Sequence, residues 1–257
     1  MRRDRSDETA ITLSEHHGIR HLHFGSEWIQ GAMRVRRPDE LVLAYCRRMM
    51  AWLLLLEPPA RMLQIGLGAG ALTRFCLSRL PDTHVTVVEK SGAVIGVNHA
   101  QFALPWTHPR LEVVQADGQD FISHPRKRRG RGGWQVMQVD VYDAEARGPV
   151  LDSPAFYAAC RDALEEPAIC VVNLFGEHAS LAPNMKRLGD AFGGRVLALP
   201  ALPEGNVIAM ALAGPPLSVP ARALRDRAAV VAERWRLSEA PEWAEMMLDG
   251  RGETFSL

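Results

Sequence analysis

The stretch Arg61-Met-Leu-Gln-Ile-Gly-Leu-Gly-Ala-Gly-Ala-Leu-Thr-Arg-Phe75 contains a short apolar strand, a glycine-rich turn and the start of a helix in direct succession. Leu63 and Ile65 predict a buried strand. The turn has no Cβ atom at three positions, so a ligand can approach its backbone closely. The glycines are Gly66, Gly68 and Gly70. A helix that begins at Ala71 directs its free N–H groups and positive dipole end toward the same crevice, which predicts a site for a nucleotide-like ligand.

A second apolar strand over residues 83–89 follows this helix and ends in Glu89. In nucleotide-binding α/β folds, an acidic residue about 20 positions after the glycine turn binds the ribose hydroxyls. We therefore interpret Glu89 as a ribose ligand, against the alternative that it merely ends a strand at the surface. The spacing also fits the loose dinucleotide fingerprint, since Gly66, Gly68 and Ala71 match its pattern.

The composition limits the classes of function. The chain has 257 residues, 47% hydrophobic, with 30 basic and 30 acidic side chains, so no net positive field favours nucleic acid. The basic run at residues 124–133 has no interleaved aromatic residues and predicts a solvated loop. The four cysteines have no metal-ligand spacing, and we expect reduced thiols, no metal site and a cytoplasmic protein. The longest apolar run, residues 49–56, is too short for a membrane span, and we expect no export signal.

The remaining segments predict one main domain with small additions. Residues 1–10 read as a disordered tail, residues 11–37 as a small region of antiparallel strands, residues 38–236 as the main domain, and residues 237–257 as a C-terminal tail. The small region, with Trp28-Ile29 as a strand, carries three histidines that we interpret as strand surface rather than metal ligands. They are His17, His21 and His23. The main domain is expected to open with a helix over residues 38–56.

Further strands are predicted at residues 111–115, 134–139 and 169–175. Residues 195–199 and 207–212 flank the turn signal Pro203-Glu-Gly-Asn206 and predict a terminal antiparallel hairpin. Parallel strands finished by an antiparallel strand favour an α/β, Rossmann-like class I S-adenosylmethionine-dependent transferase fold over a dinucleotide-binding fold. Two acids, Asp117 and Asp140, follow predicted strands, at the sheet edge where open α/β folds bind ligands.

With these segments placed, residues 19–213 resemble the spermidine synthase (polyamine aminopropyltransferase) family. The family's motifs occur here in order: a glycine turn, an acid after the second strand, Asp-Gly after the third, a paired-aspartate loop with Gly-Pro after the fourth, then Phe-Tyr. In this chain they are Gly66-Leu-Gly-Ala-Gly70, Glu89, Asp117-Gly118, Asp140-Val-Tyr-Asp143 with Gly148-Pro149, and Phe156-Tyr157. Gln30 resembles the glutamine that the family places near its nucleoside ligand.

The resemblance implies an enzyme that moves an aminopropyl group from decarboxylated S-adenosylmethionine to an amine such as putrescine. It implies that Glu89 holds the ribose, that Asp117 holds the adenine amino group, and that Asp140 acts on the attacking amine. Asp143, with Tyr45 and Tyr142, is expected to hold the polyamine. A primary amine with a pKa near 10 is about 99.9% protonated at pH 7, so a carboxylate must accept a proton before attack. The nucleoside is a co-substrate, no permanent cofactor is implied, and a homodimer is expected.

Two positions depart from the family pattern. Ala69 stands where the family has an aspartate in its glycine turn, an acid that would attract the ammonium group of the decarboxylated donor and repel the carboxylate of ordinary S-adenosylmethionine. Tyr45 is followed by Cys46-Arg-Arg48, so a cationic substrate would meet arginines if these point inward. Three alternatives therefore stay open: an aminopropyltransferase, a methyltransferase that uses ordinary S-adenosylmethionine, and a binding protein without catalysis on the same fold.

Overall fold

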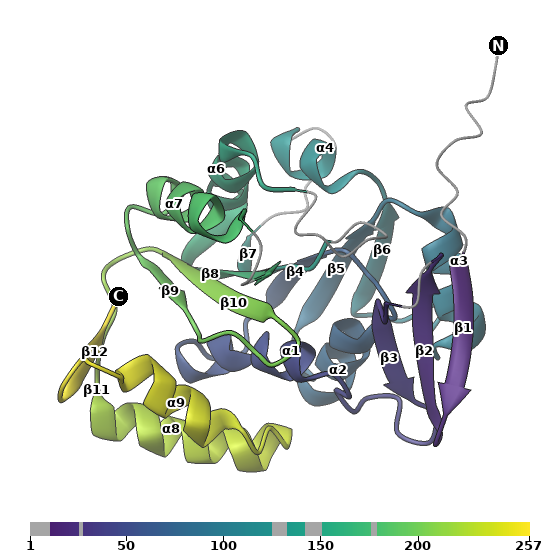
Figure 1. Ribbon diagram of the computed structural model, residues 1–257. Coiled ribbons are helices and arrows are strands. Elements are labelled where there is room, and N and C mark those ends of the chain that lie inside the picture. Colours follow the sequence, from purple (N-terminus) through teal and green to yellow (C-terminus); the bar gives the residue numbers. More distant parts are fainter. Residues whose placement is uncertain (1–10, 26–27, 125–132, 142–150, 176–178) are drawn as a thin grey trace.

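A twisted seven-stranded sheet forms the centre of the protein (Figure 1). The computed structural model describes residues 11–25, 28–124, 133–141, 151–175 and 179–257. The strand order is β6-β5-β4-β7-β8-β10-β9. The first five strands in this order run parallel, and β10 lies antiparallel to both β8 and β9. The strands are β4 (Arg61–Ile65), β5 (His84–Glu89), β6 (Leu111–Gln115), β7 (Trp134–Val139), β8 (Leu164–Phe175), β9 (Val196–Ala198) and β10 (Asn206–Ala213).

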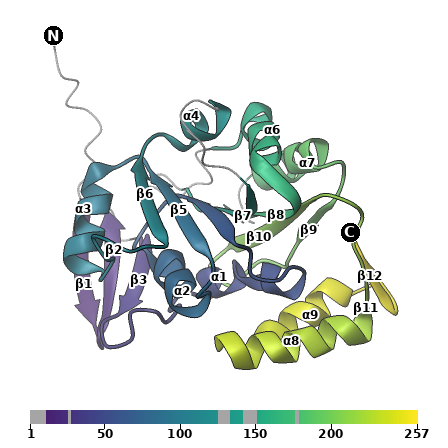
Figure 2. The same cartoon turned by 180° about the vertical axis from the view of Figure 1, so that it is seen from behind.

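The expected class of fold is confirmed, including the antiparallel end of the sheet. Helices cover both faces, because alternate residues of each buried strand point to opposite sides (Figures 1 and 2). One face packs against α4 (Gly118–Ser123), α6 (Pro154–Ala163) and α7 (Leu181–Ala191). The other packs against α1 (Ala44–Arg48), η1 (Ala51–Leu54), α2 (Ala71–Arg79), α3 (Gly92–Gln101), α8 (Ala221–Trp235) and α9 (Ala240–Leu248).

A separate three-stranded antiparallel sheet lies beside α2 and α3. It contains β1 (Ile11–His16), β2 (Ile19–Phe24) and β3 (Gly31–Arg34). Leu22 and Met33 bury against Ala69 of the glycine turn, which couples this small sheet to the main domain. The third strand was expected at Trp28-Ile29, but these side chains are 63% and 47% exposed, and the strand begins at Gly31 instead. The small residues that follow fit the close contact with the glycine turn, whereas a tryptophan does not.

The expected helix over residues 38–56 is wrong in extent, since only α1 and η1 are helical there. The acids that suggested an N-terminal helical turn are engaged in tertiary ion pairs instead. Asp39 pairs with Arg79 at 2.7 Å, and Glu40 pairs with Arg34 at 3.1 Å. Arg47 Nη1 also donates hydrogen bonds to the carbonyl oxygens of Leu41 and Val42. These contacts hold residues 38–43 in a turn and a short irregular segment instead of a helix.

The C-terminal residues pack on the main domain. Trp243 and Met247 of α9 are buried in the same apolar cluster as the sheet, together with Phe255 of β12 (Thr254–Ser256). β12 pairs with β11 (Ser218–Pro220), and α8 and α9 lie side by side (Figure 1). Residues 1–10, which were expected to form a disordered tail, lie outside the described residues.

Candidate functional site

The glycine turn and Asp140 are held together by backbone contacts at the carboxyl ends of β4 and β7. The amide of Asp140 donates to the carbonyl oxygen of Ile65 at 2.9 Å. Gly66 has a φ of 93°, and a Cβ atom there would collide with the carbonyl oxygen of Asp140. Only glycine allows both this dihedral and this approach. The sequence therefore brings the turn and the acid to one point of the sheet edge.

The Asp140 carboxyl lies in a polar cluster at this edge. Its Oδ1 accepts a hydrogen bond from Asn173 Nδ2 at 2.9 Å, and Asn206 Nδ2 donates in turn to Asn173 Oδ1 at 3.0 Å. Tyr45 of α1 also hydrogen-bonds to the carboxyl. Burial raises the pKa of Asp140 above its ordinary value, and the hydrogen bonds from Asn173 and Tyr45 act in the opposite direction. A carboxylate with a raised pKa is better suited to accept a proton than an ordinary one.

Glu89 and Asp117 lie at the ends of β5 and β6, next to the same turn. The Glu89 carboxylate accepts hydrogen bonds from the amides of Leu67 and Ser91, at 3.0 and 2.7 Å. Asp117 caps α4 by accepting from the amide of Asp120 at 3.1 Å. Gly118 packs against Ile65, and a Cβ atom there would lie 2.5 Å from the Ile65 side chain. The two acids thus lie on the same side of the glycine turn, in the strand order β6-β5-β4, and Glu89 is in direct contact with it.

Ala69 points away from solvent, into the contact with the small N-terminal sheet. Its methyl group would lie 2.6 Å from a Cβ atom built on Gly31, and it is buried with Leu22 and Phe102. Gln30 precedes Gly31 and donates its backbone amide to Leu22 at 2.8 Å. A side chain larger than hydrogen at position 31 would therefore collide with Ala69.

The two arginines after Tyr45 point away from this site. Arg47 forms an ion pair with Glu239, just before α9, and Arg48 donates to the carbonyl oxygen of Pro200 at 2.6 Å. Burial lowers the pKa of Arg48, and three nearby glutamates oppose that shift. The expectation that a cationic substrate would meet these arginines is thus not supported by their placement. Arg47 thus anchors α1 to the segment before α9, and Arg48 anchors it to the loop between β9 and β10.

A small cavity of about 20 Å³ brings together part of the expected site, whereas Gly70, Glu89, Asp117 and Gly118 do not line it. Its size is roughly that of one water molecule, which is smaller than either substrate. Gln30, Tyr45, Gly66, Gly68 and Asp140 line it. It is also lined by residues that sequence reasoning did not single out, namely Cys46, Gln64 and Thr73. The expected site residues Tyr142 and Asp143, with Gly148-Pro149, lie outside the described residues.

Beneath the cavity lies a buried hydrogen-bond network of two glutamines and a threonine. Gln64 and Gln138 are register partners on β4 and β7, and Gln64 Nε2 donates to Gln138 Oε1 at 2.9 Å. Thr73 Oγ1 donates to Gln64 Oε1 at 2.7 Å, and Gln138 Nε2 donates to the carbonyl oxygen of Met49 at 3.2 Å. Amides in strands that otherwise bury apolar side chains are the sequence signal that could have identified this network.

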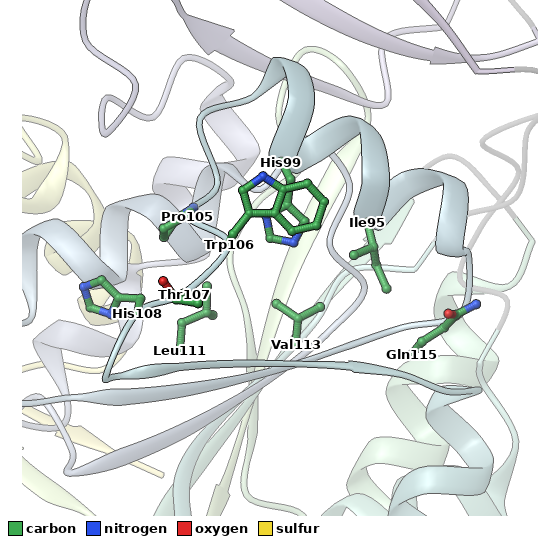
Figure 3. Close-up of a pocket in the computed structure, with 9 residues that line it drawn as sticks. All are labelled: Ile95, His99, Pro105, Trp106, Thr107, His108, Leu111, Val113 and Gln115. Atoms are coloured by element: carbon green, nitrogen blue, oxygen red, sulfur yellow. The ribbon is translucent and has the colours of Figure 1, made fainter.

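A larger cavity of about 510 Å³ lies elsewhere, between α3 and the edge strand β6 (Figure 3). Leu111 and Val113 point up from β6 toward Ile95, and the Trp106 ring stacks on His99 with ring centres 3.9 Å apart. None of the residues expected to act on a ligand lines this cavity. Within the described part of the chain, no cluster of three or more metal-ligating side chains occurs, and no helix is long and apolar enough to cross a membrane.

Comparison with known proteins identifies the class and then the family. Models of protein families give no match to the chain. Among solved structures, human methyltransferase-like protein 13 in complex with SAH aligns with a TM-score of 0.67 at 21% identity, over 76% of this chain and 93% of that one. A "probable spermidine synthase" from Corynebacterium glutamicum aligns with a TM-score of 0.69 at 18% identity, over 96% and 86%. The fold is that of class I S-adenosylmethionine-dependent transferases and spermidine synthases.

Sequence similarity narrows this class. A polyamine aminopropyltransferase from Chromobacterium violaceum is 37% identical over 227 residues, which cover 88% of this chain and 85% of the relative. The chain belongs to the polyamine aminopropyltransferase family.

Proposed function

We propose that the protein transfers an aminopropyl group from decarboxylated S-adenosylmethionine to a small amine such as putrescine. The observation that carries this proposal is the meeting of Asp140, Tyr45 and the glycine turn around one cavity. Family membership supports the class of reaction, and the site supports the roles of the residues. Glu89 is assigned to the ribose and Asp117 to the adenine amino group, with Gln30, Gly66, Gly68, Gly70 and Gly118 around the nucleoside. Tyr45, Tyr142 and Asp143 are assigned to the polyamine.

The chemistry we propose is direct displacement at carbon. The protonated amine gives one proton to the Asp140 carboxylate, which frees the nitrogen lone pair. The nitrogen then attacks the carbon attached to the sulfonium, and the carbon–sulfur bond breaks with its electron pair left on sulfur. Methylthioadenosine leaves as a neutral thioether, the new secondary amine stays protonated at neutral pH with its two remaining hydrogens, and Asp140 passes the proton it accepted to solvent. The positive charge of the sulfonium already activates the carbon, so the protein's task is to orient the amine and accept its proton.

Asp140→Asn tests this role. Asparagine keeps the shape of the side chain but cannot accept the proton, so we expect turnover of the decarboxylated donor with putrescine to fall by about 10²–10⁴-fold. Calorimetric titration with methylthioadenosine should give the wild-type affinity, because the nucleoside contacts remain. Wild-type turnover by the variant would contradict the role of Asp140.

Ala69 favours ordinary S-adenosylmethionine as a second candidate donor, since no acid at that position repels its carboxylate. Parallel titrations of the wild-type protein with the decarboxylated and the ordinary donor separate the two. We expect tighter binding of the decarboxylated donor. Tighter binding of the ordinary donor would instead support methyl transfer, and binding of neither would support a protein without catalysis. The expected homodimer and cytoplasmic location stay predictions.

A further inference from the structure

The buried network beneath the site has a fixed direction. The carbonyl oxygen of Met49 can only accept, so the Gln138 group that faces it must be the amide nitrogen. The Gln138 oxygen then faces Gln64 Nε2, and the Gln64 oxygen faces Thr73. Thr73 must therefore donate its single hydroxyl hydrogen to Gln64. This direction follows from the backbone carbonyl of Met49 alone.

Thr73 keeps two oxygen lone pairs after this donation, and it has no hydrogen left to offer. The residue is almost fully buried, yet it lines the cavity that also contains Asp140 and Gly68. Its hydroxyl can act there only as an acceptor. A ligand group at this point must consequently bring its own hydrogen, as an ammonium group does.

Such an acceptor is needed because position 69 offers none. The Ala69 methyl group is packed against Gly31, so the glycine turn carries no acid toward the cavity. Asp140 is occupied by Asn173 and by the proton transfer assigned to it. We propose that the Thr73 hydroxyl accepts a hydrogen bond from the terminal ammonium group of the three-carbon arm of decarboxylated S-adenosylmethionine. This specificity role rests on the proposed function.

The test compares two ligands that share a nucleoside but differ in the arm. Calorimetry gives the dissociation constants of decarboxylated S-adenosylmethionine and of methylthioadenosine, which has no ammonium group, for wild type, Thr73→Val and Thr73→Ser. A lost hydrogen bond to a charged group predicts that Thr73→Val weakens binding of the decarboxylated donor by about tenfold or more. Binding of methylthioadenosine should stay within about twofold of wild type, within the scatter of such measurements. Thr73→Ser should restore the donor affinity.

Thr83→Val is the matched control. Thr83 is equally buried and donates to the carbonyl oxygen of Pro59 at 2.7 Å, but it does not line the cavity. This variant loses a hydroxyl hydrogen bond without any expected change in the ratio of the two dissociation constants. An unchanged ratio in Thr73→Val would overturn the inference while leaving the proposed function intact. Failure of the wild-type protein to bind either ligand would contradict both.

Discussion

At the scale of single residues, the burial that raises the pKa of Asp140 suits the proton transfer we propose for it but lowers the stability of the fold when the carboxyl is ionised. Burial raises its pKa above the ordinary value of 3.8, so the folded state disfavours the ionised form. The stabilising contribution of such a carboxyl is fully present below pH 3.8 and is lost as the pH rises through the folded-state value. At neutral pH the charge therefore destabilises the fold.

We expect Asp140→Asn to raise the Tm at pH 7, by about 2–4 °C for each kcal/mol relieved. The difference between variant and wild type should shrink as the pH is lowered toward the ordinary carboxyl value. Thermal unfolding followed by circular dichroism over a series of pH values measures this. A lower Tm of the variant at pH 7 would contradict the sign of the effect.

Burial raises the pKa of Asp140, and the hydrogen bond from Asn173 opposes that shift. Because that bond lowers the pKa of the carboxyl, Asn173→Leu should raise it further. The acidic limb of the pH–rate profile should move to higher pH, and part of the lost activity should return there. Asn184→Leu is a matched control, since Asn184 is buried and accepts from Tyr157 at 2.8 Å, far from Asp140 in sequence. An equal shift in both variants would count against a specific role of Asn173.

Sequence reasoning at this scale could place Glu89, Asp117 and Asp140, because each follows an apolar strand and strand ends meet at one edge of the sheet. It could not place Asn173, since its partner is set by the pairing of β7 with β8. The direction of Arg47 also depends on a contact with Glu239, far away in the chain. Long-range contacts of this kind leave no local pattern.

At the scale of elements, the contact between β3 and the glycine turn fixes the position of the turn, which we assign to the nucleoside. Gly31→Ala would place a methyl group 2.6 Å from the Ala69 Cβ and 2.8 Å from its amide nitrogen. We expect overpacking to destabilise the fold by about 1–3 kcal/mol, and the displaced turn to weaken binding of methylthioadenosine. Urea denaturation and calorimetry measure the two effects.

Gly96→Ala provides the comparison for that variant. Gly96 lies within α3, and no atom lies within 4 Å of an added Cβ. The same change should stabilise the fold there by up to about 1 kcal/mol, through helix propensity. Equal stability effects in the two variants would contradict the close-contact explanation.

The strands and helices of the main domain follow from local patterns, whereas residues 38–43 do not, because tertiary ion pairs hold their acids.

At the scale of the whole molecule, the main sheet and the C-terminal helices share one core. Trp243→Ala should therefore destabilise the entire fold by about 3–5 kcal/mol, with a single transition in scanning calorimetry. Trp28→Ala, at a side chain that is 63% exposed, should change stability by less than about 0.5 kcal/mol. Two separate transitions, with only one of them shifted by Trp243→Ala, would show that the C-terminal helices unfold independently.

The ion pair between Arg47 and Glu239 joins residues 192 positions apart. It ties the helix that carries Tyr45 to the segment that precedes α9. A chain emerging from the ribosome begins to fold from its N-terminal side, so the sheet can start to form while this anchor is still being synthesised. The helix that carries Tyr45 would gain this ion pair only when translation has passed Glu239. The site around Tyr45 would thus be completed late in the synthesis of the chain.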